Sequence, residues 1–302
     1  MSFRKQLKTL RKSTLRALAD LRRAALRRGA LANGDAYELV TDPGTAWPGY
    51  AALPAGADDA AGHSISCVMV SRGLPDIVGG ALASFAAQDH ARRELVVVVP
   101  APRIEAVRRL AAAHAVDARI IAAPDGATLG ELRNLGIARS DGEIVCQWDD
   151  DDIYARDRLR LTASALVRSH KAAALLNRVT FWWPARRTIA ISKPRHWEGT
   201  IAVWRKAIPI YPALARGEDT FVTHGILRYG GVAMLDAPEL YVYRVTGRNT
   251  WDEPHFERIL KACTDIRTGA DHDRRIEALS RRVGPHLAQR APTGAPTDPV
   301  HP

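Results

Sequence analysis

The chain has 302 residues, 46% of them hydrophobic, and a formal net charge of +10. This length is enough to bury one large core or two modest ones. Residues 1–30 hold ten Lys/Arg and one Asp, a net charge of +9, so only about +1 is left for the other residues. The rest of the protein is therefore not expected to bind nucleic acid, because the excess positive charge is concentrated in residues 1–30.

The cysteines and the hydropathy pattern predict a cytoplasmic protein. Cys67, Cys146 and Cys263 are far apart and have no metal-ligand spacing, which suits a reducing compartment. No run approaches the roughly 18 apolar residues that a membrane span needs. The N-terminus also lacks the apolar region of a secretory signal.

Residues 1–30 predict a basic amphipathic helix, because leucines recur at roughly helical spacing with Lys and Arg between them. Like-charge pairs four residues apart, such as Arg4 and Lys8, each cost roughly 0.2–0.5 kcal/mol, so the isolated helix is marginal. An anionic membrane surface would relieve the repulsion and hold the protein peripherally on the inner face of the membrane. The alternative is a helix that packs on the body and leaves its basic face to solvent.

The next part of the chain predicts βαβ units. Residues 31–62 are rich in Gly, Ala, Pro and Asp, without a period, and predict a linker or a wrapping arm. Strands are expected at 65–70, 94–99, 119–122 and 144–148, and helices at 77–87, 104–114, 129–138 and 156–169. This alternation is typical of a parallel sheet.

The second half is expected to build the rest of one domain. Strands are predicted at 173–181, 232–235 and 240–245, and helices from Glu218 to about 229 and from 253 to about 268. Between them, tryptophans and basic residues lie among short strand-like pieces. The predicted organisation is one domain over 63–268, divided into 63–170 and 171–268, with a C-terminal helix and a disordered tail over 269–302.

The acidic stretch after the strand at 144–148 is the strongest chemical signal. Four consecutive aspartates, Asp149 to Asp152, stand where a buried strand leaves the sheet. Ligand sites of open α/β sheets lie at such strand ends. Two neighbouring carboxylates repel by about 4 kcal/mol at an effective dielectric near 20, so a cation would stabilise the cluster. Oxygen ligands suit Mg²⁺ or Mn²⁺. The alternative is an acidic turn that caps the next helix.

Several common sites are absent from the sequence. It contains no G-x-x-x-x-G-K-[ST] phosphate loop, no G-x-G-x-x-G dinucleotide turn and no H-E-x-x-H motif. The EF-hand pattern also fails, because Ile153 occupies a ligand position and Tyr154 the position of the invariant glycine. The acidic strand end and a second acidic pair, Glu218 and Asp219, are what the sequence offers for chemistry.

Taken together, these motifs resemble a family 2 glycosyltransferase of the GT-A fold. The resemblance covers about residues 64–250: the first strand and its helix, the strand at 94–99, Leu132-Arg133-Asn134 before the D-x-D acids, and Gly217-Glu218-Asp219. It implies an α/β fold, with a GT-A Rossmann-like, mostly parallel sheet and flanking helices, to which the basic N-terminal helix is added. It also implies a metal-dependent transfer from a nucleotide-sugar donor to a hydroxyl acceptor, with inversion at the anomeric carbon.

The resemblance assigns roles residue by residue. Asp149 and Asp151 would bind Mn²⁺ or Mg²⁺, and Asp219 would be the catalytic base with Glu218 beside it. The donor-binding residues would be Ser71, Arg72, Arg133, Asn134, Asp150 and Asp125. The acceptor-binding residues would be Trp197, Glu198, Gly199 and Arg205. The acceptor is expected to be a surface-glycan or lipid-linked precursor.

The sequence departs from the family pattern at two places. The second strand is followed by Val99-Pro100-Ala101-Pro102 and not by the acid that holds the nucleoside, for which Asp125 is a substitute. The metal-binding His after the last strand is missing, and Thr246 and His255 are the nearby candidates. Two other functions stay open at this point: a nucleotidyltransferase with the same sheet and carboxylates, and a non-catalytic nucleotide- or glycan-binding module.

Overall fold

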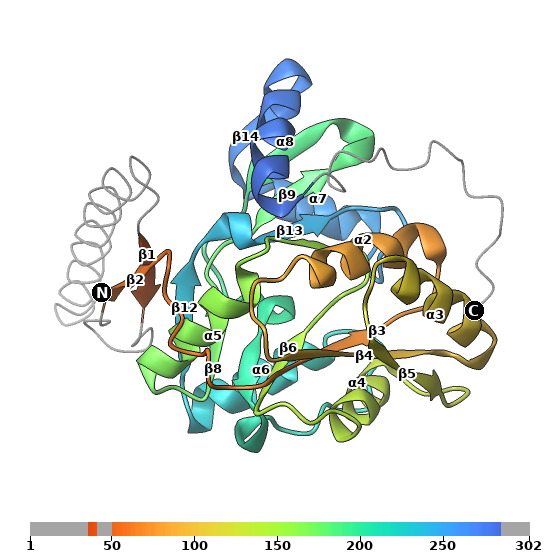
Figure 1. Cartoon of the computed structure of the whole chain (residues 1–302). Coiled ribbons are helices and arrows are strands. Elements are labelled where there is room, and N and C mark those ends of the chain that lie inside the picture. Colours follow the sequence, from red (N-terminus) through yellow and green to blue (C-terminus); the bar gives the residue numbers. More distant parts are fainter. Residues whose placement is uncertain (1–35, 41–49, 285–302) are drawn as a thin grey trace, which may run out of the picture.

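The first half of the structure alternates strands and helices, as predicted. The computed structural model describes residues 36–40 and 50–284. β3 (Ile65–Val70), β4 (Arg93–Pro100), β5 (Ala118–Ala123) and β6 (Ile144–Gln147) pair in parallel, in the order β6-β3-β4-β5. The helices between them are α2 (Pro75–Ala86), α3 (Ile104–Ala113) and α4 (Leu129–Ala138) (Figure 1).

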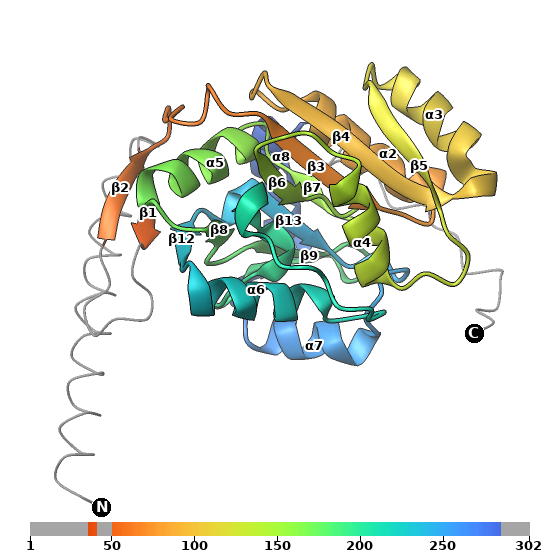
Figure 2. The ribbon, with the colours of Figure 1, turned by 90° about the horizontal axis from the view of Figure 1, so that it is seen from below.

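The helices cover both faces of these strands. α2 and α3 lie on one face and α4 on the other (Figure 2). α4 begins with a capping box, in which Thr128 accepts from the Glu131 backbone and the Glu131 carboxylate accepts from Thr128. The helix packs closely on β3 because Gly136 has no side chain: a Cβ there would lie 2.5 Å from Val68 Cγ1.

The parallel strands are the core of a larger, mixed sheet. β11 (Ala202–Trp204) lies antiparallel between β6 and β8 (Ala173–Leu176), and β12 (Val232–Asp236) runs parallel to β8. The nine strands have the order β2-β1-β12-β8-β11-β6-β3-β4-β5. The expected α/β fold with flanking helices is confirmed, while antiparallel strands extend the sheet beyond the parallel part.

The far edge of this sheet corrects one expectation. No strand was predicted within 31–62, but β1 (Ala36–Val40) and β2 (Tyr50–Pro54) form there, and β1 pairs antiparallel with β12. Leu39 and Leu53 are buried, 2% and 0% exposed, which explains why the pair docks on the sheet. The predicted basic helix over 1–30 and the tail beyond 284 lie outside the described residues.

A second sheet contains five short strands in the order β14-β10-β9-β13-β7. They are β7 (Ile153–Tyr154), β9 (Thr180–Trp183), β10 (Thr188–Ile191), β13 (Tyr241–Arg244) and β14 (Thr264–Thr268). The predicted single strand over 173–181 is wrong, because its two ends belong to β8 and β9 in different sheets. At the break, Arg178 forms an ion pair of 2.7 Å with Asp236 of β12.

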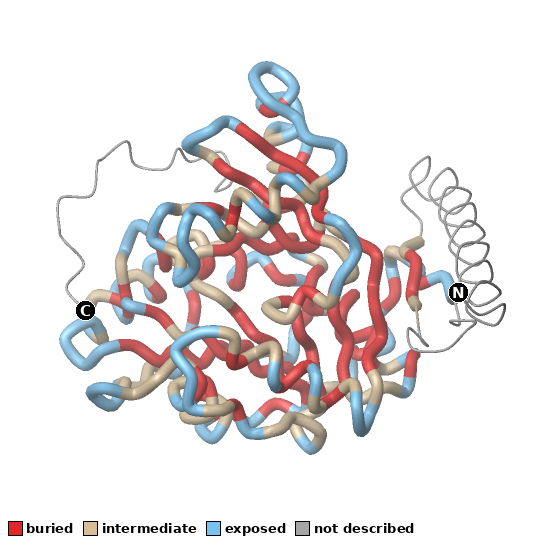
Figure 3. The backbone as a smooth tube through the Cα atoms, turned by 180° about the vertical axis from the view of Figure 1, so that it is seen from behind, coloured by how far each residue is buried: buried red, intermediate tan, exposed pale blue. Residues whose placement is uncertain are grey.

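Four further α-helices lie in the described residues: α5 (Arg158–Ser169), α6 (Glu218–Tyr229), α7 (Glu253–Lys261) and, after β14, α8 (Gly269–Val283). The helix predicted over 253–268 is too long, because its last residues form β14, where β-branched residues recur. The central strands are buried and the exposed segments lie at the periphery (Figure 3). Within the described ranges, no helix is long and apolar enough to cross a membrane.

Candidate active site

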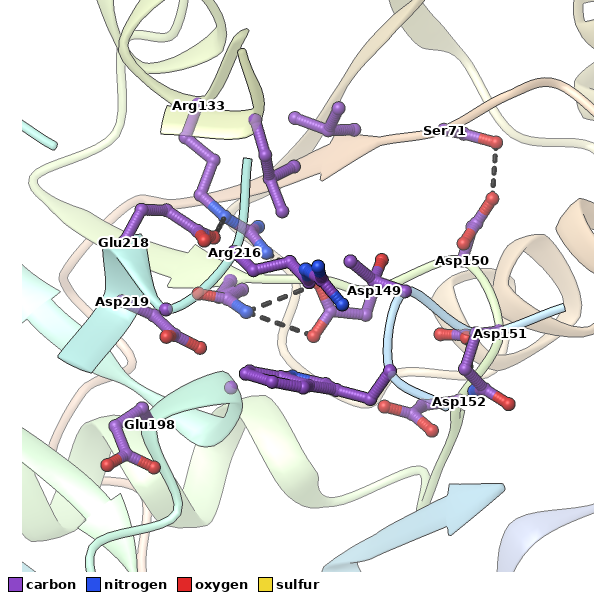
Figure 4. Close-up of a pocket in the computed structure, with 18 of the residues that line it drawn as sticks. Ser71, Arg133, Asp149, Asp150, Asp151, Asp152, Glu198, Arg216, Glu218 and Asp219 are labelled. Carbon is purple, nitrogen blue, oxygen red and sulfur yellow. Dashed lines mark hydrogen bonds and ion pairs between the residues drawn. The ribbon is translucent and has the colours of Figure 1, made fainter. Parts of the chain in front are cut away.

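A cavity of about 520 Å³ opens where β3 and β6 end and α6 begins. Its lining includes the acidic turn after β6, the start of α6, the segment around Trp197 and the loop after β13. Figure 4 shows the labelled acids around this cavity, with Asp149 to Asp152 on one side and Glu218, Asp219 and Glu198 on the other. Residues from both predicted halves of the domain therefore meet in one place.

Aromatic side chains fix the acidic turn. Trp148 is fully buried, and its indole N–H donates to the Ala81 carbonyl at 3.2 Å. Its ring stacks on Tyr154 with 3.8 Å between centroids, and the Tyr154 hydroxyl donates to the Asp149 carbonyl at 2.9 Å. Trp148 and Tyr154 thus fix the end of β6 from the side of the core, and the carboxylates of the turn face the cavity.

Asp149 is held by protein donors on both oxygens. Arg133 Nη2 donates to Oδ1 at 3.1 Å, and Gln147 Nε2 lies 3.2 Å from Oδ1 and 3.0 Å from Oδ2. Gly199 packs beside this carboxylate, since a Cβ at that position would lie 3.1 Å from Asp149 Oδ2. Gly199 therefore allows a close backbone approach to the acid.

The other three acids have different partners. Ser71 Oγ donates to Asp150 at 2.5 Å, and Asn249 Nδ2 donates to Asp151 at 2.5 Å. Asp152 is only 1% exposed; it accepts from the Tyr241 hydroxyl and, at 2.9 Å, from the Arg244 backbone. Asp152 thus ties the turn to β13.

Burial makes this cluster of negative charge unfavourable without a cation. The pKa of Asp150 is raised to about 6 and that of Asp151 to about 7, mainly by burial and also by the neighbouring aspartates. The pKa of Asp152 is raised well above its usual value, also by burial. The donor set consists of carboxylate oxygens, which fit Mg²⁺ or Mn²⁺. Within residues 36–40 and 50–284, no group of three or more His, Cys, Asp or Glu is arranged to hold a metal by itself.

Glu218 is sealed in an ion pair at the start of α6. Gly217 precedes it with φ +73°, a left-handed conformation that glycine adopts without strain. Glu218 is 2% exposed, and its Oε1 lies 2.8 Å from Arg133 Nε. Because the same guanidinium reaches Asp149, Arg133 bridges the acidic turn and α6.

Asp219, in contrast, is half-buried and lines the cavity with its carboxylate. Its Oδ1 accepts from the Thr220 backbone at 2.8 Å. Burial raises its pKa to about 6, and the Arg133 guanidinium partly offsets this effect. The carboxylate is therefore mostly ionised at neutral pH, as a proton acceptor must be.

Three residues predicted for the site do not line the cavity. The Asn134 amide donates to the Tyr211 carbonyl at 2.8 Å and accepts from the Tyr211 N–H at 2.9 Å. Asp125 is exposed in the turn before α4. Arg205 donates to the carbonyls of Gly142 and Ile137, at 2.6 and 3.0 Å.

The remaining predicted residues are in the cavity wall. Ser71 and Arg72 lie at the end of β3, and Trp197 is 7% exposed beneath Arg195, whose guanidinium carbon is 4.6 Å from the ring centroid. Arg195 also pairs with Glu198 at 2.7 Å. Thr246 and His255 line the wall too, and His255 stacks on Trp251 at 4.5 Å.

Sequence reasoning missed several contacts of the acidic turn, among them those of Gln147 and Asn249. Gln147 could have been found, because it stands two residues before Asp149 on the strand, and residues two apart share a face. Asn249 carried no local signal, since only the fold of the second sheet brings the loop after β13 to Asp151.

Comparisons with solved structures find distant similarity. S. aureus TarS 1–349 in complex with UDP is 16% identical, over 65% of this chain and 69% of that chain, with a TM-score of 0.47. The mannosyltransferase PcManGT from Pyrobaculum calidifontis, in complex with GDP-Man and Mn²⁺, is 19% identical over 62% and 59%, with a TM-score of 0.46. A mycobacterial protein is 18% identical over 72% and 78%, with a TM-score of 0.47. No curated protein matches.

The sequence itself matches a family model. The model described as "Glycosyl transferase family 2" aligns with residues 66–216, half of the 302-residue chain. The aligned part contains the first βαβ units, the acidic turn and the segment around Trp197, and it ends two residues before Glu218. The chain therefore belongs to glycosyl transferase family 2 and is a glycosyltransferase.

Proposed function

We propose that the enzyme moves a sugar from a nucleotide-sugar donor to a hydroxyl acceptor, with inversion at the anomeric carbon and with Mn²⁺ or Mg²⁺. The observation that carries this proposal is the arrangement of the acids in one cavity. The acidic turn offers carboxylates on one side, and Asp219 offers a separate carboxylate on the other. Glu218 is buried in an ion pair and Asp152 is buried and hydrogen-bonded, so their proposed role is to hold the other residues of the site in position.

The acidic turn is the proposed donor side. Asp149 and Asp151 would hold the metal, which when bound neutralises charge on the departing diphosphate. Ser71 and Arg72 line the same end of the cavity and can donate to phosphate oxygens, and Ser71 already orients Asp150. Arg133 acts from behind, because its ion pairs keep Asp149 in place.

Asp219 is the proposed base. It would accept the proton of the acceptor hydroxyl as that oxygen attacks the sugar from the face opposite the leaving group. A positioned base typically contributes about 10²–10⁴-fold in rate. Trp197, Glu198 and Gly199 line the same cavity as Asp219 and form the proposed acceptor side. We further propose a glycan or lipid-linked acceptor, with residues 1–30 attaching the enzyme to an anionic membrane surface.

The metal assignment can be tested by calorimetry with UDP and GDP in the presence of Mn²⁺. The Asp149→Asn, Asp151→Asn double variant should lose metal-dependent nucleotide binding while its melting temperature stays near that of the wild type. Asp125→Asn is the control, because Asp125 is an exposed acid outside the cavity. Equal affinity of the double variant and the control would contradict the assignment.

A further inference from the structure

The surface formed by residues 206–230 has an unusual composition. Its exposed residues are Lys206, Ile210, Ala213, Leu214, Ala215, Arg216, Phe221, His224, Arg228, Tyr229 and Gly230. None of them is acidic, and none carries a neutral hydroxyl or amide other than the tyrosine. We call this surface the α6 face; Figure 2 shows α6 near the lower edge of the molecule.

Large apolar side chains concentrate on the α6 face. Of the six large hydrophobic side chains exposed in the described part of the chain, four are here: Ile210 (84%), Tyr229 (83%), Phe221 (64%) and Leu214 (36%). The loop before α6 lies against the helix, since a Cβ on Gly225 would be 3.3 Å from Pro209 Cγ. Phe221 stands one turn before Gly225 on α6, and Ile210 follows Pro209 in the loop, so each belongs to one of the two segments that make this contact.

The charge of the α6 face has one sign. Lys206 and Arg228 are exposed, and the exposed Arg216 turns toward the cavity, with its guanidinium carbon 5.5 Å from the Trp251 ring centroid. The two acids of α6 do not add negative charge to this face, because Glu218 is buried on Arg133 and Asp219 lines the cavity. The exposed side of α8 is different, because acids and arginines alternate along it. A surface of apolar and basic residues without acids is typical of segments that bind an anionic lipid interface.

We propose that the α6 face docks on an anionic lipid bilayer. Ala215 and Arg216 belong to this face and also line the cavity, so docking would bring the mouth of the cavity to the membrane surface beside Asp219. This inference rests on the proposed function, and it specifies the acceptor class: a sugar hydroxyl on a lipid-linked molecule. The contact is separate from any contribution of residues 1–30.

The test uses the full chain, so that residues 1–30 are present in every variant. Binding to sedimented vesicles of phosphatidylglycerol with phosphatidylcholine is compared for the wild type, the double variant Ile210→Ser with Phe221→Ser, and Ile266→Ser. Ile266 is the matched control, since it is 48% exposed on β14, away from the α6 face. The double variant should bind about tenfold more weakly, because two large apolar side chains lose their place in the interface. The control should bind like the wild type.

A second lipid composition and a third variant test the charge and the position of the contact. Pure phosphatidylcholine vesicles should bind the wild type more weakly, because the basic residues then lack anionic headgroups. Tyr229→Ser, at the far end of α6 from the cavity, should weaken binding with unchanged affinity for UDP or GDP with Mn²⁺. Equal vesicle binding by the double variant and the control, or none by the wild type, would overturn the inference. Failure of the proposed function would appear separately, as no nucleotide binding by the wild type in solution.

Discussion

At the scale of single residues, Glu218 and Asp219 are adjacent in sequence but have opposite surroundings. Glu218 neutralises Arg133 in a buried pair, whereas Asp219 faces the cavity. The family resemblance gave Asp219 as the catalytic base with Glu218 beside it, although the local pattern places both in the first turn of a predicted helix. These surroundings are the reason why we propose Asp219 as the proton acceptor and Glu218 as a positioning residue.

Asp219→Asn should therefore lower kcat by about 10²-fold or more while donor affinity barely changes. Glu218→Gln should instead leave the buried Arg133 with its ion pair to Asp149 but without the one to Glu218, and lower the free energy of unfolding by about 1–3 kcal/mol. Turnover and urea denaturation measured on both variants separate the two effects. If Asp219→Asn kept normal turnover and Glu218→Gln lost it without loss of stability, the two roles would have to be exchanged.

The raised pKa of Asp219 has a consequence for the pH profile. Because burial raises this pKa to about 6, kcat should fall as the pH drops through that value. The measurement needs saturating metal and donor, so that the acidic turn is compensated. The free energy of unfolding changes in the opposite direction. Because folding favours the protonated form of Asp219, the contribution of Asp219 to this free energy is complete below about pH 4 and is lost as the pH rises through about 6. Asp219→Asn should remove the loss, and its melting temperature should exceed that of the wild type more at pH 8 than at pH 4.

At the scale of elements, α4 links packing to the site. Gly136 lets the helix lie close to β3, and Arg133 on the same helix bridges Asp149 and Glu218. Any displacement of α4 from the sheet therefore moves the guanidinium that holds both sides of the cavity together.

Gly136→Ala should test this link. Its methyl group would lie 2.5 Å from Val68 Cγ1, so we expect a loss of about 1–3 kcal/mol in the free energy of unfolding and a lower kcat. Gly80→Ala is the control in α2, where no atom lies within 4 Å of the added carbon; there the change should stabilise the helix by about 0.5–1 kcal/mol. Equal effects of the two substitutions on turnover would refute the link.

Some strands and helices could be predicted from the sequence more accurately than others. β3 and α4 were predicted at their observed bounds, because turn residues follow each of them in the sequence. The run at 173–181 could not be divided, since both β8 and β9 are apolar and only their partners differ. Asn134 and Arg205 were assigned to binding from the family resemblance, whereas in the structure their side chains form hydrogen bonds to backbone groups.

At the scale of the whole molecule, the acids of the cavity come from segments that local patterns identified. Asp149 to Asp152 and Glu218-Asp219 follow strand or loop ends that the sequence marks clearly. What could not be predicted is the strand order, in which β11 enters antiparallel between β6 and β8. Strand order depends on contacts between distant residues, and these leave no periodic trace in the chain.

The pairing of β1 with β12 determines when the molecule can finish folding. Glu38 stands opposite Asp236, so nearly the whole domain separates two strands that share hydrogen bonds. Closing so long a loop is entropically unfavourable and slow, and we expect this edge of the sheet to form last. Until β1 arrives, β12 presents an unpaired edge that can pair with another copy of the chain. Refolding at high protein concentration should therefore divide between native protein and aggregates that start at this edge.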